Sequence, residues 1–373
     1  MGITGEFQTT ENYVVYHEVG HLQAGIRLDA FLKERYRKRS RESLKQAIES
    51  GAIRVERRGG PHLTLGRLKP ASQLIAGDRV LVESERKPEP EVDFNYKVLF
   101  EDEVLFVIYK PANLPVHPAG RYFFNTLLVH LKTEGLRNPL NAEREYFLVH
   151  RIDKETSGIL VLTKDREVCT HLTRQFAERQ TRKRYLAVVR GIPAQTEFFV
   201  DAPLRRALNS RVELKMEIAP KDLPEETPDH IKGQTAFTSF RVLETAGDFA
   251  LVECFPKTGR QHQIRVHLDS VGHPIVGDKL YGMDEEEAAR FFERKFLSPE
   301  AEAKLLLPRH ALHSCLLGFT HPVTGKEVTF ESPLPDDLRA FLDRQKKKHA
   351  TVLPETVNGQ PAESPFLPAT LLR

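Results

Sequence analysis

Residues 150–165 read HRIDKETSGILVLTKD, and this stretch carries more structural information than any other part of the chain. The apolar run Ile159–Leu162 follows Thr-Ser-Gly, a pattern typical of a turn that leads into a buried strand. Asp153 would then lie at the rim of that strand, where binding and catalytic side chains are often found. Taken alone, Asp153 also fits a turn or capping residue, and Arg151 beside it fits a surface ion pair.

The composition is that of a globular chain without a membrane span. Its 373 residues are 40% hydrophobic and 29% charged, and this length allows two domains and a tail. We find no run of 18 apolar residues and no signal peptide at the N-terminus. The cysteines, Cys169, Cys254 and Cys315, form no CxxC pair, so we expect neither a zinc site nor disulfides. These features predict a cytoplasmic protein.

Positive charge is concentrated near the N-terminus. Residues 27–69 hold thirteen Lys and Arg against five Asp and Glu, a net charge of +8, whereas the whole chain carries +3. Such a segment is typical of a protein that contacts a phosphate backbone, although a charge run taken alone favours a solvated helix face.

The same segment has the pattern of a small module over residues 27–86, after an N-terminal extension over 1–26. Apolar spacing predicts a helix near residues 28–32, and Ser40 is placed to cap a second helix that ends at Gly51. Strands are expected at residues 53–55 and 79–82.

A Pro-containing linker at residues 87–95 separates this module from a larger domain over 96–342, and residues 343–373 have the composition of a mobile tail. Strand-like and helical segments alternate irregularly in the larger domain. We therefore expect an α+β fold with a mainly antiparallel sheet. The expected strands lie at 104–109, 159–162, 185–189 and 249–254, and the expected helices at 126–131 and 167–176.

Several blocks together resemble one enzyme family. HRIDKETSG at 150–158 is similar to the H-R-L-D-x-x-T-S-G motif of the RluA family of RNA pseudouridine synthases, with Ile152 in place of leucine. Asn113 stands where the family has glycine, and asparagine tolerates left-handed backbone. The resemblance covers about residues 96–336. The other matching blocks are KPANLPVHP at 110–118, KRYLAVVRG at 183–191, TGRQHQIRVH at 258–267, HPIVGDKLYG at 273–282, and Leu312-His313 with His321-Pro322.

The resemblance implies the pseudouridine synthase fold and assigns roles to individual residues. Asp153 matches the catalytic aspartate, Tyr185 the active-site tyrosine, and Arg265 an arginine that would pair with Asp153 and lower its pKa. Arg151 would fill the space that the flipped uridine leaves. The reaction moves the ribose bond from nitrogen to carbon 5 of the same base, so no metal or other cofactor is expected. His150, His262 and His267 are expected to be structural.

The N-terminal module resembles the α-L RNA-binding domain of a ribosomal protein. The resemblance implies structured RNA as partner, with phosphate contacts from Arg37, Lys38, Arg39, Arg41 and Lys45. The pairing of domains favours large-subunit ribosomal RNA. HPAGRY at 117–122 instead resembles a segment of enzymes that act on the transfer RNA anticodon arm. Transfer RNA therefore remains an alternative substrate. We expect a monomer.

Three other functions compete with this interpretation. HEVGH at 17–21 satisfies the H-E-x-x-H pattern of zinc enzymes, but Gly20 weakens a helix there. A non-catalytic RNA-binding assembly factor would not need Asp153, Tyr185 and Arg265. An RNA deaminase would need a zinc pattern such as P-C-x-x-C, which the sequence lacks.

Overall fold

The computed structural model describes residues 12–37, 39–57, 63–64, 66–85, 88–137 and 145–352. The chain divides into two compact units, residues 1–88 and 89–373. Within the described ranges, no helix has both the length and the apolar character needed to cross a membrane.

The N-terminal unit is a four-stranded antiparallel sheet, in the order β1-β4-β2-β3, packed against two helices. Its core contains Phe31 and Leu32 from the first helix, Leu44 and Ile48 from the second, and Val80 from the sheet. As predicted, the Ser40 side chain accepts a hydrogen bond from the Ser43 amide at 3.1 Å. The elements are β1 (Asn12–Glu18), a short 3-10 helix (His21–Gln23), α1 (Leu28–Arg35), α2 (Arg41–Glu49), β2 (Ile53–Arg57), β3 (Leu63–Thr64) and β4 (Arg79–Glu85).

The prediction that residues 1–26 form a separate extension is wrong for residues 12–26. β1 pairs with β4 along its whole length, from Asn12 opposite Glu85 to Glu18 opposite Arg79. Val19 is buried in the core of this unit. The local sequence pattern could not predict this pairing. β1 and β4 lie at opposite ends of the unit, and neither sequence specifies which strand is its partner.

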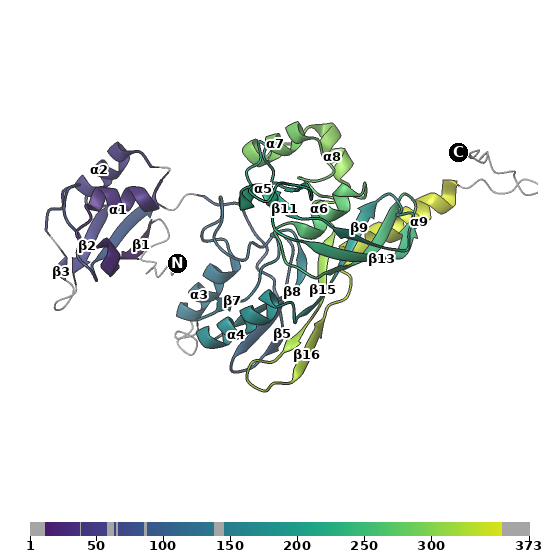
Figure 1. The fold of residues 1–373 in the computed structure, drawn as a ribbon, viewed down its shortest axis with the longest axis horizontal. Coiled ribbons are helices and arrows are strands. Elements are labelled where there is room, and N and C mark those ends of the chain that lie inside the picture. The colour runs from purple at the N-terminus through teal and green to yellow at the C-terminus, as the bar shows by residue number, and fades with distance from the viewer. Residues whose placement is uncertain are drawn as a thin grey trace, which may run out of the picture. The chain divides into compact units, whose positions relative to one another are not determined.

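The second unit is built on a ten-stranded sheet (Figure 1). Eight strands follow the order β10-β13-β14-β9-β15-β8-β6-β5, with β16 beside β15 and β7 beside β8, and β11 and β12 form a separate pair. Every pairing in the large sheet is antiparallel except that of β15 with β8, so the predicted α+β class with a mainly antiparallel sheet is confirmed. The strands are β5 (Lys97–Glu101), β6 (Leu105–Lys110), β7 (Phe147–Leu148), β8 (Ser157–Thr163), β9 (Arg182–Arg190), β10 (Glu197–Asp201), β11 (Leu204–Arg206), β12 (Met216–Ile218), β13 (Phe237–Ala246), β14 (Phe249–Pro256), β15 (Leu312–Thr320) and β16 (Glu327–Glu331).

β8 is the central strand that the opening motif predicts. All of its residues are buried, and it pairs with β6, β7 and β15. Gly158 has φ +112°, and a Cβ there would lie 2.2 Å from the Ser314 carbonyl oxygen. Only glycine therefore permits β15 to approach the start of β8 this closely.

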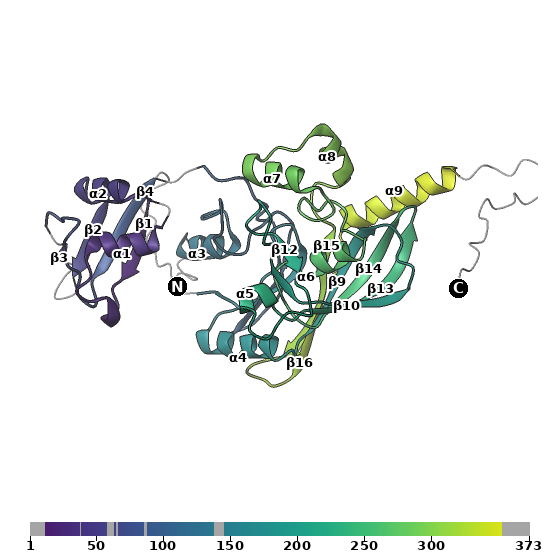
Figure 2. The same cartoon turned by 45° about the horizontal axis from the view of Figure 1, so that its top comes forward.

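Among the helices of the second unit, α9 runs along β13 and β14 (Figure 2). Leu338, Phe341 and Leu342 of α9 are buried in the same core cluster as Val252 of β14. The helices are α3 (Leu127–Arg137), α4 (Arg166–Ala177), α5 (Asp229–Lys232), α6 (Gln263–Ser270), α7 (Glu285–Arg294), α8 (Pro299–Leu305) and α9 (Asp336–Val352).

Two predicted boundaries differ from the structure. Residues 343–352, expected in the tail, continue α9, and Lys346 pairs with Glu244 at 3.1 Å. The rest of the predicted tail lies outside the described residues. The predicted linker packs on the second unit from residue 89 onward, because the Glu89 carboxylate accepts hydrogen bonds from the Phe124 and Asn125 amides. Pattern alone gave no sign of these contacts, since their partners are more than thirty residues away.

Candidate active site

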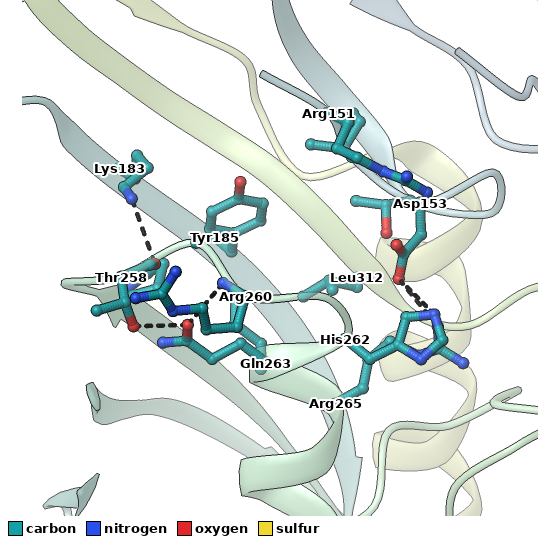
Figure 3. Close-up of a pocket in the computed structure, with 15 residues that line it drawn as sticks. Arg151, Asp153, Lys183, Tyr185, Thr258, Arg260, His262, Gln263, Arg265 and Leu312 are labelled. Carbon is teal, nitrogen blue, oxygen red and sulfur yellow. Dashed lines mark hydrogen bonds and ion pairs between the residues drawn. The ribbon is translucent and has the colours of Figure 1, made fainter. Parts of the chain in front are cut away.

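A pocket lies in the second unit where several strand ends and one helix end meet (Figure 3). The empty space within it is about 510 Å³, part of which is open solvent. Arg151 and Asp153 come from the loop before β8, and Tyr185 from β9. The loop after β14 and the start of α6 close the other side. The lining is Arg151, Ile152, Asp153, Thr156, Lys183, Tyr185, Pro256, Thr258, Gly259, Arg260, His262, Gln263, Ile264, Arg265 and Leu312.

The predicted contact between Arg265 and Asp153 is present. Arg265 Nη1 donates to Asp153 Oδ2 at 2.9 Å, and the Asp153 side chain keeps 21% of its surface exposed. Burial alone would raise the pKa of Asp153. The positive charges of His262, when protonated, and of Arg265 outweigh burial and hold this pKa well below the usual range of an aspartate. The pocket therefore presents an ionised carboxylate to a ligand at neutral pH.

Asp278 holds the far side of the same guanidinium, a contact that sequence analysis did not predict. Arg265 donates to it through Nε at 2.6 Å and Nη2 at 2.8 Å. Asp278 Oδ1 also accepts from the amides of Leu280 and Tyr281. Burial would raise the pKa of Asp278, but Arg265 dominates and lowers it to about 2. Arg265 is thereby fixed between two carboxylates, of which only Asp153 faces the pocket.

The loop that carries Asp153 is fixed from below by a buried lysine. Lys110 Nζ donates to the carbonyl oxygens of Pro111, Leu114 and Lys154 at 2.8, 3.0 and 3.1 Å. Burial lowers the pKa of Lys110 to about 7. Three carbonyl acceptors match the three donors of an ammonium group, so the hydrogen bonds favour the charged form.

A second ionic contact fixes the same loop from the side. Lys279 Nζ donates to both Glu155 oxygens at 2.8 and 2.9 Å, and Thr156 Oγ1 lies 2.8 Å from His310 Nε2. The Thr156 amide donates back to the Asp153 carbonyl at 3.1 Å. The backbone on either side of the carboxylate is therefore held before any ligand arrives.

Tyr185 and Arg151, the other two predicted site residues, both line the pocket. Figure 3 shows the Tyr185 ring between Lys183 and Asp153. Burial raises the pKa of Tyr185 to about 12, so its hydroxyl is neutral at physiological pH. Arg151 is exposed, and its Nη1 lies 3.3 Å from His117 Nε2. It makes no ion pair among the described residues, which leaves its charge available to an anion.

Two of the three histidines that were expected to be structural have structural contacts alone. His150 is stacked on Phe176 and accepts a hydrogen bond from the Val161 amide, while His267 contacts Thr238, so both have structural contacts. His262 instead lies in the pocket, with Nε2 3.9 Å from Asp153 Oδ2. Its φ of 56° is left-handed, and this turn before α6 points the ring at the carboxylate. Sequence pattern gives no warning of a left-handed histidine.

The five predicted RNA contacts belong to the N-terminal unit. Arg37, Arg41 and Lys45 are exposed near the start of α2, and Arg39 is half-buried against the Tyr36 ring. Lys38 lies outside the described residues.

The zinc hypothesis for HEVGH does not fit the structure. His17 and Glu18 lie on β1 and His21 lies in a 3-10 helix, so the two histidines do not share a helix face. His17 Nε2 is instead 2.8 Å from the Tyr36 hydroxyl. Among the residues that the structure describes, no group of three His, Cys, Asp or Glu could hold a metal ion.

Comparisons with known proteins converge on one activity. Residues 104–270 match the family model described as RNA pseudouridylate synthase. Ribosomal large subunit pseudouridine synthase D of Zymomonas mobilis is 34% identical over 85% of this chain and 93% of its own length. Ribosomal large subunit pseudouridine synthase C of Escherichia coli K12 is 33% identical over 86% and 93%, respectively. The solved structure of human RNA pseudouridylate synthase domain containing 4 is 28% identical, with a TM-score of 0.52 over 67% of this chain and 92% of that one.

Proposed function

The chain belongs to the RluA family of RNA pseudouridine synthases, and on that premise we propose that it isomerises uridine in large-subunit ribosomal RNA with Asp153 as the catalytic aspartate. The substrate is inferred from relatives named as ribosomal large subunit synthases that align along most of this chain. The enzyme is an isomerase, so the substrate and product contain the same atoms.

The observation that carries the catalytic assignment is the ionised, partly exposed Asp153 carboxylate in a pocket beside an aromatic ring. The reaction breaks the bond between the ribose and N1 of uracil, reorients the base, and forms a bond from the ribose to C5. C5 then loses its proton and N1 gains one, so that the substrate and product have the same composition. Asp153 acts either as a nucleophile toward the base or sugar or as a base at carbon 2′. Both roles need the carboxylate charged, and Arg265 keeps it charged and oriented.

Tyr185 and Arg151 have roles in holding the nucleotide. The neutral phenol of Tyr185 offers a flat face on which uracil stacks beside Asp153. The guanidinium of Arg151, which lines the pocket and is exposed, occupies in this proposal the stack that the uridine leaves. Burial keeps His262 mostly neutral by lowering its pKa to about 4, so it serves as a hydrogen-bonding group next to the carboxylate.

The N-terminal unit supplies RNA affinity in this proposal. Its exposed Arg37, Arg41 and Lys45, with Arg39, form a basic surface at the start of α2. Such a surface favours a structured RNA through its phosphates and gives binding that weakens with salt.

The substrate is tested by mapping pseudouridine with a carbodiimide reagent in total RNA from cells with and without the gene. We expect one or a few sites to disappear from large-subunit ribosomal RNA in the cells that lack it. Loss confined to the transfer RNA anticodon arm would replace the proposed substrate and leave the enzyme class unchanged. Purified protein that converts no uridine in either RNA class would contradict the catalytic proposal.

A further inference from the structure

The pocket has two chemically different sides, and the proposed reaction uses only one of them. Figure 3 shows Asp153, Arg265 and His262 on one side of Tyr185, and Lys183, Thr258 and Arg260 on the other. The second side has two cationic groups and no carboxylate within its lining. Its role is therefore not explained by orientation of the catalytic aspartate.

Lys183 is a half-buried cation without a negative partner. Its Nζ donates to the Thr258 carbonyl oxygen at 3.3 Å, and no carboxylate of the described ranges lies within ion-pair distance. Burial, followed by the nearby charges of Arg179 and Arg260, lowers the pKa of Lys183 to about 8. Most of the population stays charged at pH 7, although like charges surround it. Neighbouring positive charges that are partly stripped of water destabilise the folded protein unless an anion binds between them.

Arg260 is held at the same edge by neutral groups. Its Nε donates to the Thr235 carbonyl at 3.1 Å, and its amide donates to Gln263 Oε1 at 3.0 Å. Thr258 Oγ1 donates to the same Gln263 oxygen at 2.7 Å. The other guanidinium nitrogens of Arg260 form no ion pair with a carboxylate of the described residues. The loop is thus rigid, and the outer nitrogens of Arg260 are left for a ligand.

Gly259 lies next to Lys183. A Cβ at that position would be 3.9 Å from Lys183 Nζ, an ordinary van der Waals distance, so the glycine places no bulk against the ammonium group. Two other lysines of this unit with little exposure have matched partners, since Lys279 has Glu155 and Lys110 has three carbonyls. Lys183 differs from both, and this difference indicates a ligand site rather than a structural contact.

We propose that Lys183 and Arg260 form a subsite for a backbone phosphate of the RNA, adjoining the target uridine. This inference rests on the proposed function, because it takes the ligand of the pocket to be a nucleotide. A nucleotide placed with its sugar at Asp153 and its base on Tyr185 carries its anion at the periphery, where the two cations lie. The phosphate supplies the negative charge that the protein itself lacks at this edge.

The test measures RNA binding in the Asp153→Asn background, so that the RNA is not consumed. The probe is the large-subunit ribosomal RNA fragment in which the native enzyme forms pseudouridine. Lys183→Met and Arg260→Met are each expected to weaken binding about tenfold, the usual scale for a charged hydrogen bond. Each should also reduce the slope of log affinity against log salt by about 0.7, the value for one single-strand phosphate.

Lys326→Met is the matched control. It removes the same charge from the exposed turn between β15 and β16, at the end of β15 opposite to the pocket residue Leu312. This variant is expected to keep the parental affinity and salt slope. Lys183→Arg, which restores the charge, should recover most of the affinity that Lys183→Met loses, and this recovery separates a phosphate contact from a folding defect.

A chemical substitution in the RNA gives an independent measurement. An uncharged methylphosphonate at the phosphate on either side of the target uridine should weaken binding to the parent protein at one of the two positions. The same substitution should have no further effect on the Lys183→Met, Arg260→Met double variant. Unchanged affinity and salt slope in both single variants would overturn the subsite, while conversion of uridine by the native enzyme would still support the proposed function.

Discussion

Replacing Asp278 by asparagine should damage the protein in a way that replacing Asp153 does not. Asp278 is buried and accepts two hydrogen bonds from Arg265 at 2.6 and 2.8 Å, and its folded-state pKa is about 2. The substitution would place a neutral amide against a guanidinium that stays buried and charged. Breaking a buried ion pair from one side costs about 3–5 kcal/mol of unfolding free energy. In a unit of this size we expect the melting temperature to fall by roughly 6–20 °C.

Asp153→Asn should be milder for stability. Arg265 keeps both hydrogen bonds to Asp278, and the Asp153 side chain is 21% exposed, so the lost contact is partly replaced by water. We expect a loss of about 1 kcal/mol, the scale of an ordinary hydrogen bond. The two variants therefore distinguish Asp278, which stabilises the buried Arg265, from Asp153, which Arg265 orients.

Urea unfolding followed by circular dichroism measures the stabilities, and pseudouridine formation measures the activities. Asp278→Asn should keep detectable turnover, reduced by about 10²-fold because Arg265 is less well positioned. The stability that Asp278 contributes is complete above about pH 4 and is lost as the pH falls through its lowered pKa of about 2, so the gap to the native enzyme should narrow in acid. If Asp278→Asn is as stable as the native protein, or less destabilised than Asp153→Asn, the reasoning is wrong.

Three further changes test other parts of the account. Lys110→Met leaves three carbonyls without their donor and should cost at least about 3 kcal/mol in urea unfolding, so an unchanged midpoint would contradict the charged form of Lys110. Gly158→Ala forces a Cβ against the Ser314 carbonyl and should prevent the stable pairing of β8 with β15, visible as insoluble protein or early proteolysis, whereas native-like expression and melting would show that the strands can move apart. Deletion of residues 1–88 should weaken RNA binding more at low salt than at high salt and leave the second unit folded, and equal losses at both salt concentrations would exclude a role through phosphates.

The sequence predicted those features that depend only on residues close together in the chain. The apolar run at Ile159–Leu162 became the buried core of β8, and Ser40 caps α2 because its side chain reaches an amide three residues ahead. Asn113, which stands in place of a glycine, has a φ of 60°, as its tolerance of left-handed backbone suggested.

Contacts between distant segments were less accessible. Arg265 and Asp153 could be paired from the family resemblance, but Asp278 could not, because nothing in a buried turn indicates which cation it meets. The location of His262 depends on a left-handed backbone that histidine rarely adopts, and the pairing of β1 with β4 joins residues 61 to 73 positions apart. These features follow from tertiary packing, which periodicity does not encode.

The most direct test of the central claim compares the native enzyme with Asp153→Asn on the same RNA, measuring both pseudouridine formation and binding. We predict that the variant forms no pseudouridine over hours while its Kd stays within about threefold of the native value, since one partly exposed carboxylate contributes little to affinity. Measurable turnover by Asp153→Asn would contradict the assignment of Asp153 as the catalytic aspartate.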